Sequence, residues 1–267
     1  MSGSGNDFVF FDNRDGRNND LVATEVIGAI CDRRRGVGAD GIVLIDAHPT
    51  LTFGMRYYNR DGSLAEMCGN AALCSSRLAR ELGVVGDGDF TFETPSGPVT
   101  ARFVEGTPEV DMMAVTELQP AFVTPLSEGE TRMGFARVGV PHLVVLCEDV
   151  DEIDVITRGR KLRRLSTLRD GANVNFISRL TEGQWAMRTY ERGVEEETLA
   201  CGTGTVASAA LLTAWGLTSG GVRLTTRSGL QIYATGGTAD HPPVLRGEGR
   251  IVFEGRLDEL SPRNTPN

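Results

Sequence analysis

The chain has 267 residues, of which 40% are hydrophobic and 24% charged, and its formal net charge is −9. This length suits one large domain or two modest ones. The acidic balance argues against binding to nucleic acid or to an anionic membrane surface, both of which need basic protein surface. A small anionic substrate stays possible, because a few local donors can capture one.

The sequence also predicts where the protein resides. No apolar run approaches the roughly 20 residues that cross a bilayer, and residues 1–7 lack the basic and apolar regions of a signal peptide. We therefore expect a cytoplasmic protein whose five cysteines stay reduced. The cysteines form no Cys-x-x-Cys pair and the three histidines are scattered, so we expect no metal site.

In chain order, the first elements are short runs of β-branched and aromatic residues, at 8–11, 42–45 and 55–58, which predict strands. Residues 71–82 have the spacing of a helix that ends at Gly83. Further on, residues 205–215 are apolar on nearly every face and end at Gly216, which indicates a buried helix. Turn signals at 60–62 and 96–97 favour antiparallel pairing.

The same motifs occur twice in the same order, at offsets of 132 to 134 residues. The matched segments are Gly5-Asn6-Asp7-Phe8 with Gly139-Val140-Pro141-His142, Gly38-Ala39-Asp40 with Gly171-Ala172-Asn173, residues 55–60 with 187–192, Cys68-Gly69-Asn70 with Cys201-Gly202-Thr203, Gly83 with Gly216, and residues 94–97 with 226–229. So many ordered matches indicate an internal duplication of a unit of about 130 residues, a usual domain size.

The duplication predicts an α+β protein of two pseudo-symmetric domains, each a mainly antiparallel sheet wrapped around one central helix. We place the first domain at 1–115 and the second at 116–250, with the boundary near 115–125 and a strand near 250–260 that packs back onto the first domain. Residues 261–267 are polar and contain two prolines, so we expect a loose tail.

Cys68 and Cys201 each precede a glycine and the start of a predicted helix. A helix start exposes unpaired N–H groups with about half a positive charge, which favours thiolate over thiol and can hold a carboxylate. Two such thiols suit removal of the α-hydrogen of an amino acid on one face and its return on the other, with no cofactor. Helix N–H groups would stabilise the charge that develops at the carboxylate.

Other interpretations compete with this one. An isolated cysteine is most often a small buried hydrophobe, which we expect for Cys31, Cys74 and Cys147. Cys68 and Cys201 could instead form a redox disulfide, although redox pairs usually lie in one short motif. A third possibility is a binding protein with this fold and no turnover.

The duplicated motifs resemble those of diaminopimelate epimerase along nearly the whole chain. The matching segments are Gly5-Asn6-Asp7-Phe8, residues 59–63, residues 66–70, Asn173-Val174-Asn175-Phe176, residues 190–193 and residues 197–204. The resemblance implies a cofactor-independent epimerase that interconverts LL- and meso-diaminopimelate in lysine and cell-wall precursor synthesis, often as a homodimer.

The resemblance also implies roles for single residues. Cys68 and Cys201 correspond to the base and acid, and His142 and Glu191 to neighbours that tune the thiols. The residues that correspond to substrate-binding positions are Asn6, Asn59, Gly69, Asn70, Asn173, Glu191, Arg192, Gly202 and Thr203. Structural alternatives are a packed histidine at 142 and a solvated charge at 192.

Two positions depart from the family pattern. Val140 stands where many members carry an asparagine, and Gly41 stands where some carry a glutamine. Both changes concern recognition of the substrate's distal end and leave the cysteines untouched. The alternative is therefore a related amino-acid racemase with another side-chain specificity. A proline-racemase-like enzyme fits less well, because that group resembles Cys-Gly-His where this chain has Cys68-Gly69-Asn70.

Overall fold

The computed structural model describes residues 1–258, which divide into two compact units. Among these residues, unit 1 holds 1–110 and 248–258, and unit 2 holds Asp111–Gly247. None of the helices among the described residues is long and apolar enough to cross a membrane. The tail expected at 261–267 lies outside the described residues.

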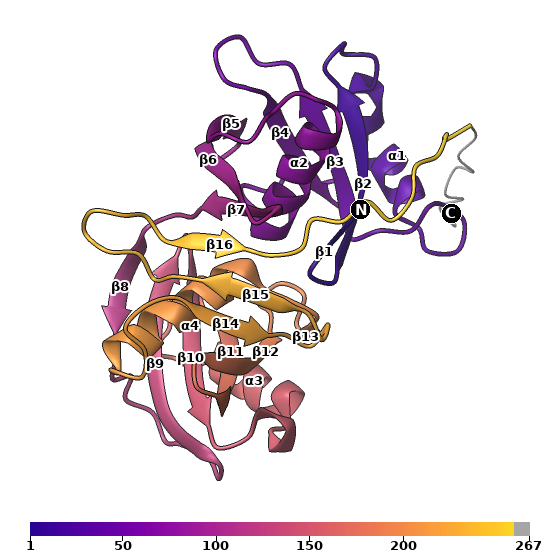
Figure 1. The fold of residues 1–267 in the computed structure, drawn as a ribbon. Helices are drawn as coiled ribbons and strands as arrows, with labels where there is room; N and C mark the ends of the chain where they lie inside the picture. Colours follow the sequence, from indigo (N-terminus) through magenta and orange to yellow (C-terminus); the bar gives the residue numbers. More distant parts are fainter. Residues whose placement is uncertain (259–267) are drawn as a thin grey trace, which may run out of the picture. The chain divides into compact units, whose positions relative to one another are not determined.

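Unit 1 is a mixed sheet with the strand order β1-β2-β3-β4-β5-β6-β7 and the helix α2 packed against it (Figure 1). Its elements are β1 (Ser2–Gly3), β2 (Asn6–Asn13), the 3-10 helix η1 (Asn19–Val22), α1 (Thr24–Ile30), β3 (Gly41–Asp46), β4 (Gly54–Asn59), α2 (Gly69–Glu81), β5 (Phe90–Thr94), β6 (Gly97–Val104) and β7 (Thr107–Asp111).

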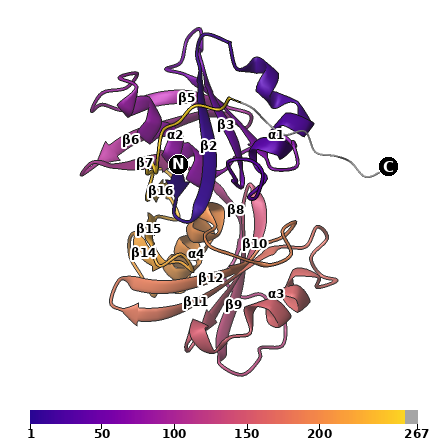
Figure 2. The same cartoon turned by 90° about the vertical axis from the view of Figure 1, so that its right-hand side faces the viewer.

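Unit 2 has the strand order β16-β15-β14-β12-β11-β10-β9-β8, with β13 paired to β12. Its elements are β8 (Val115–Gln119), β9 (Glu130–Val138), β10 (Val140–Cys147), the 3-10 helix η2 (Val150–Glu152), α3 (Val155–Arg163), β11 (Asn173–Thr181), β12 (Gln184–Tyr190), β13 (Glu197–Thr198), α4 (Gly202–Ala214), β14 (Val222–Thr225), β15 (Gln231–Ala234) and β16 (Val244–Arg246). Helix α4 contacts β8, β9, β10, β11, β15 and β16, so the sheet surrounds it (Figure 2).

The two sheets repeat one pattern of strand directions. In unit 1, β2 and β3 are parallel, β3 and β4 antiparallel, β4 and β5 parallel, and β5 and β6 antiparallel. In unit 2, β10, β11, β12, β14 and β15 follow with the same sequence of directions. The predicted α+β fold with two similar, mainly antiparallel sheets is therefore confirmed.

Both central helices end as the sequence predicts. Gly83 and Gly216 adopt the left-handed conformation, with φ of 67° and 70°. Each donates its N–H to a carbonyl of the last helical turn, Gly83 to Arg80 and Gly216 to Thr213. The absence of a Cβ makes this conformation accessible. The helices begin two to three residues earlier than the apolar spacing indicates, directly after the two cysteines.

The strand expected near 250–260 is not found in the described part of that segment. Residues 251–258 adopt no regular strand, and the chain near 250 makes a single antiparallel bridge with Ser2 instead. The N–H of each of these two residues, Ser2 and Arg250, donates to the carbonyl of the other, at 2.8 and 2.9 Å. Residues 251–257 continue along an apolar hollow of unit 1 that Phe10, Phe11 and Leu78 also line.

The strand register corrects one match of the duplication. Phe8 pairs with Gly41 on β3, and His142 pairs with Asn173 on β11. Gly41 also pairs with Asn59, and the antiparallel ladder of β11 and β12 places Asn173 opposite Glu191. The structural counterpart of Asn173 is therefore Gly41, and the alignment of Asp40 with Asn173 is wrong by one residue.

A one-residue insertion explains the shift. Gly38 and Gly171 both adopt positive φ before the strand, at 82° and 65°, so the two glycines do correspond. Two residues separate Gly38 from β3, but only one separates Gly171 from β11. Asp40 is therefore the residue that unit 1 has in addition.

Gly41 has no room for a side chain. A Cβ there would collide with the carbonyl oxygen of Tyr58 and the ring of Tyr57. We expect Gly41→Ala to lower the free energy of unfolding by about 1–3 kcal/mol, the usual cost of overpacking. Gly54→Ala in the neighbouring strand is the matched control, because its nearest atom would be Asp46 Cβ at 3.7 Å. Urea unfolding of both variants measures the difference, and equal stability would contradict the predicted collision.

Candidate active site

Helices α2 and α4 start with the same backbone geometry, and a cysteine occupies the N-cap of each. Cys68 has φ −137° and ψ 113°, and Cys201 has φ −137° and ψ 108°. Within residues 1–258, neither side chain makes the usual N-cap hydrogen bond to its helix. Serine, threonine, aspartate or asparagine would normally fill that position and accept such a bond. Each thiol is therefore set beside a helix start whose first backbone N–H groups have no acceptor inside the helix.

In unit 1, a chain of polar groups runs from the surface to the start of α2. Arg33 donates to Asp7 and Asp40, at 2.7 and 2.9 Å. The Asn6 amide donates to Asp40 Oδ2 at 3.1 Å, and Asn70 donates to Asn6 Oδ1 at 2.6 Å. Because Asp40 Oδ2 accepts, the amide of Asn6 has one orientation. This orientation then directs the Asn70 amino group toward Asn6.

Asn59 lies at the same edge of unit 1. It ends β4 opposite Gly41, and its side-chain amide donates to Ser63 Oγ at 3.0 Å. Gly69 and Asn70 are buried in the first turn of α2. The structure thus gathers Asn6, Asn59, Gly69 and Asn70 on the edge of unit 1 where Cys68 begins its helix.

Unit 2 gathers its predicted residues in the corresponding place. His142 near the start of β10 pairs with Asn173 at the start of β11. Asn173 Oδ1 accepts the backbone N–H of Arg192 at 2.8 Å, and the Arg192 guanidinium donates to the Asp170 carbonyl at 3.0 Å. Glu191 directly follows β12, so the loop that carries it is tied to the sheet through its neighbour Arg192.

The start of α4 completes this group. Cys201 is 8% exposed, and its sulfur lies 3.6 Å from the Thr203 hydroxyl, which is within hydrogen-bond range for sulfur. Gly202 is buried at the first helical position. Cys201, Gly202 and Thr203 thus lie together at the start of α4, in the same unit as Asn173 and Arg192.

His142 is fully buried and neutral. Burial, with a smaller contribution from the charge of Arg192, lowers the pKa of His142 to about 3. Its Nδ1 lies 3.2 Å from the amide nitrogen of Asn175, a residue to which no role was assigned from the sequence. Asn175 alternates with Asn173 along β11, and a second asparagine on one face of a buried strand is the sequence signal that could have identified it.

The three other cysteines behave as predicted. Cys31, Cys74 and Cys147 are buried, with 5%, 0% and 4% exposure. Burial raises the pKa of Cys74 and of Cys147 to about 12, so these thiols stay protonated.

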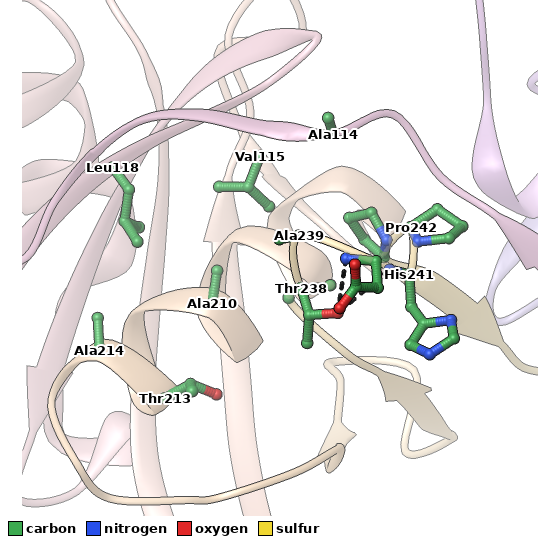
Figure 3. A pocket seen from close by; sticks show the side chains of 14 residues that line it. Ala114, Val115, Leu118, Ala210, Thr213, Ala214, Thr238, Ala239, His241 and Pro242 are labelled. Atoms are coloured by element: carbon green, nitrogen blue, oxygen red, sulfur yellow. Dashed lines mark hydrogen bonds between the residues drawn. The ribbon is translucent and has the colours of Figure 1, made fainter.

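Two hollows in the structure lie apart from the cysteines. One, of about 560 Å³, lies in unit 2 between the end of α4, with Ala210 and Ala214, and the loop that contains Thr238 and His241 (Figure 3). Cys201 is at the opposite end of α4. The apolar hollow of unit 1 does not include Cys68. Among residues 1–258, no group of three or more histidine, cysteine, aspartate or glutamate side chains is arranged to hold a metal ion.

Comparison with known proteins points to one family along most of the chain. The family model described as "Diaminopimelate epimerase" matches residues 1–117 and 134–248. A diaminopimelate epimerase from Gemmatimonas aurantiaca is 42% identical over 97% of this chain and 98% of its own length. One from Aquifex aeolicus is 40% identical over 97% and 96%.

Solved structures share the fold at low identity. A phenazine biosynthesis protein of the PhzF family from Bacillus anthracis has a TM-score of 0.69 at 12% identity, covering 92% of this chain and 91% of its own. A probable proline racemase from Agrobacterium radiobacter has a TM-score of 0.61 at 19% identity, covering 94% and 83%. These likenesses concern the fold alone. The family model and the close relatives together show that this chain belongs to the diaminopimelate epimerase family.

Proposed function

We propose that this chain interconverts LL- and meso-diaminopimelate by proton transfer between two cysteines, without a cofactor. The observation that carries the proposal is the equivalence of Cys68 and Cys201, which cap two helices of the same length with the same backbone angles. Membership of the diaminopimelate epimerase family supports the choice of substrate.

The reaction follows from this arrangement. One cysteine, as thiolate, takes the α-proton on one face of the substrate, and the electron pair of the broken C–H bond spreads into the α-carboxylate. Backbone N–H groups at Gly69, Asn70, Gly202 and Thr203 are the proposed donors to that carboxylate. The other cysteine, as thiol, delivers its proton to the opposite face, and the centre is inverted. The roles of the thiols exchange in the reverse direction.

The proposed polar shell differs between the halves. In unit 1, Asn6 and Asn59 offer amide groups, and in unit 2, Asn173, Glu191 and Arg192 offer an amide, a carboxylate and a guanidinium. A guanidinium suits a carboxylate through paired hydrogen bonds, so we assign Arg192 to the distal end of the substrate. His142 and Glu191 are the proposed groups that set the protonation of the thiols.

We also propose a cytoplasmic location and a homodimeric state for this protein. A pair of thiols close to one carbon is also close to disulfide distance, so a reducing cytoplasm would keep the enzyme active. The homodimer would cover exposed apolar side chains of unit 1 such as Val252 and Phe253, 54% and 65% exposed.

The second candidate is a related racemase that acts on another amino acid. Val140 favours this candidate, because Val140 is the counterpart of Asn6 in the duplicated motif. The polar side chain that unit 1 has at this position is therefore missing in unit 2. Gly41 has no room for the glutamine that some family members carry there.

We expect Cys68→Ala and Cys201→Ala each to lower the rate of epimerisation by about 10²–10⁴-fold or more, the usual contribution of a positioned acid or base. Cys74→Ala and Cys147→Ala are matched controls, because both side chains are buried in the interior of their units. The measurement is the conversion of LL- to meso-diaminopimelate by the purified variants. Full turnover in either active-site variant would refute the two-cysteine mechanism.

Uptake of solvent deuterium at the α-carbon tests the assignment of diaminopimelate as the substrate. We expect LL- and meso-diaminopimelate to exchange faster than lysine, glutamate or proline, because the distal end needs both a carboxylate and an ammonium group. A monocarboxylic amino acid that exchanges fastest would select the second candidate.

Val140→Asn should restore one neutral hydrogen bond to the distal end. We expect KM for diaminopimelate to fall by between about twofold and tenfold with little change in kcat, because such a bond contributes about 0.5–1.5 kcal/mol. Val140→Ala removes the same apolar bulk without adding an amide and serves as the control. A lower KM in both variants would show that space, and not polarity, limits binding.

A further inference from the structure

A buried row of three polar side chains crosses the middle strands of unit 2. Thr189, Asn175 and His142 come from β12, β11 and β10 and are 2%, 0% and 0% exposed. Thr189 Oγ1 donates to Asn175 Oδ1 at 3.0 Å, and Asn175 Nδ2 lies 3.2 Å from His142 Nδ1. Polar groups buried this deeply are costly unless each finds a partner, so their pairing determines how they are protonated.

The amide of Asn175 can adopt one orientation. Its nitrogen also lies 3.2 Å from the carbonyl oxygen of Leu143, which can only accept a hydrogen bond. The atom facing that carbonyl must therefore be the amino group. The amide oxygen then faces Thr189, whose hydroxyl supplies the proton. Every hydrogen-bonding atom of the Asn175 side chain has a partner in this arrangement.

The orientation of Asn175 determines the state of His142. One amino hydrogen points to Leu143 and the other to His142 Nδ1, so Nδ1 must carry a lone pair. A neutral imidazole with an acceptor at Nδ1 carries its proton on Nε2. A charged ring would place a second hydrogen between Nδ1 and the amino group of Asn175, where the two would repel. This contact and the burial of His142 therefore both favour the neutral ring. Its Nε2 is buried and has no hydrogen-bond partner within residues 1–258.

This row reaches the start of α4. A Cβ on Gly204 would collide with Asn175 Oδ1 and would lie 3.2 Å from Cys201 Sγ. Asn175 thus packs into the space that a glycine leaves, in the same turn that Cys201 caps. The side chain of Asn175, oriented by Leu143 and Thr189, therefore packs against the same helical turn that places the thiol.

We propose that Asn175 is a positioning residue that holds His142 as the neutral Nε2–H tautomer, so that this imidazole serves the site as a hydrogen-bond donor and not as a base. Neither nitrogen can accept a thiol proton, because Nδ1 is occupied by Asn175 and Nε2 already bears hydrogen. His142 Nε2–H is then suited to stabilise an anion, either a thiolate or a substrate carboxylate. The tautomer is inferred from these contacts alone. The role of His142 in the reaction rests on the proposed function.

Long-range ¹H–¹⁵N NMR of the full-length protein reads the tautomer directly, because protonated and unprotonated ring nitrogens have well-separated shifts. The chain has three histidines, and His48→Gln and His241→Gln variants assign the signals of the other two. We expect His142 to show the Nε2–H pattern at neutral pH. An Nδ1–H pattern or an imidazolium in the wild-type protein would overturn the proposal without any variant being made.

Asn175→Asp tests the role of the amide, because a carboxylate has no hydrogen to give to Nδ1. We expect His142 to shift to the Nδ1–H or imidazolium form, and kcat for diaminopimelate to fall by about tenfold to a hundredfold, the range for loss of a hydrogen bond to a charged group. Thr189→Val is the control, since it keeps both amino hydrogens of Asn175 and should keep the Nε2–H pattern. An unchanged tautomer in folded Asn175→Asp would refute the positioning role.

The two readouts separate the two proposals. The NMR pattern needs no turnover, so an Nε2–H tautomer in a protein that fails to epimerise diaminopimelate would refute the substrate assignment alone. Retained epimerisation with an Nδ1–H tautomer would refute the role of Asn175 alone.

Discussion

The first backbone N–H groups of α2 and α4, which have no acceptor inside their own helix, are the constraint on which the rest of the site depends. A helix start needs acceptors for its first N–H groups, and most proteins provide one from the N-cap side chain. Cys68 and Cys201 are poor acceptors in the position where a good one is usual. The bodies of these helices are held by burial instead: most of α4 is buried against its sheet. These helices therefore do not depend on a side-chain capping bond, and in the proposed function their starts receive the substrate carboxylate.

The two copies of the unit solve one problem by different means. Each must hold an amide still beside a cysteine. Unit 1 does so with charge, since Arg33 and the inserted Asp40 orient Asn6 and through it Asn70. Unit 2 does so with buried neutral groups, since Leu143 and Thr189 orient Asn175. The charged solution suits a half-exposed edge, and the neutral one suits a strand interior where an unpaired charge would be far more costly.

The sequence predicts the large features well and fails on a few single residues. The duplicated motifs, Gly83 and Gly216 lead to the two-unit fold, because helix ends and internal repeats leave local signals. The alignment of Asp40 with Asn173 in the repeat is wrong by one residue, because Gly38-Ala39-Asp40 and Gly171-Ala172-Asn173 look alike while unit 1 has one residue more before its strand. The lack of space at Gly41 and the bond from Asn175 to His142 arise from tertiary packing, which no local pattern contains.

Duplication followed by divergence suits the proposed reaction. Moving a proton from one face of a carbon to the other requires two equivalent groups, and the matched caps at Cys68 and Cys201 meet that requirement. Recognition of the side chain requires the reverse, because the substrate's distal end extends to one side only. Asn6 against Val140, Asn59 against Glu191 and Gly41 against Asn173 are three positions at the strand ends where the two units differ. The positions that must stay alike for proton transfer are backbone and thiol, whereas those free to differ are side chains at the strand ends, so one fold meets both requirements.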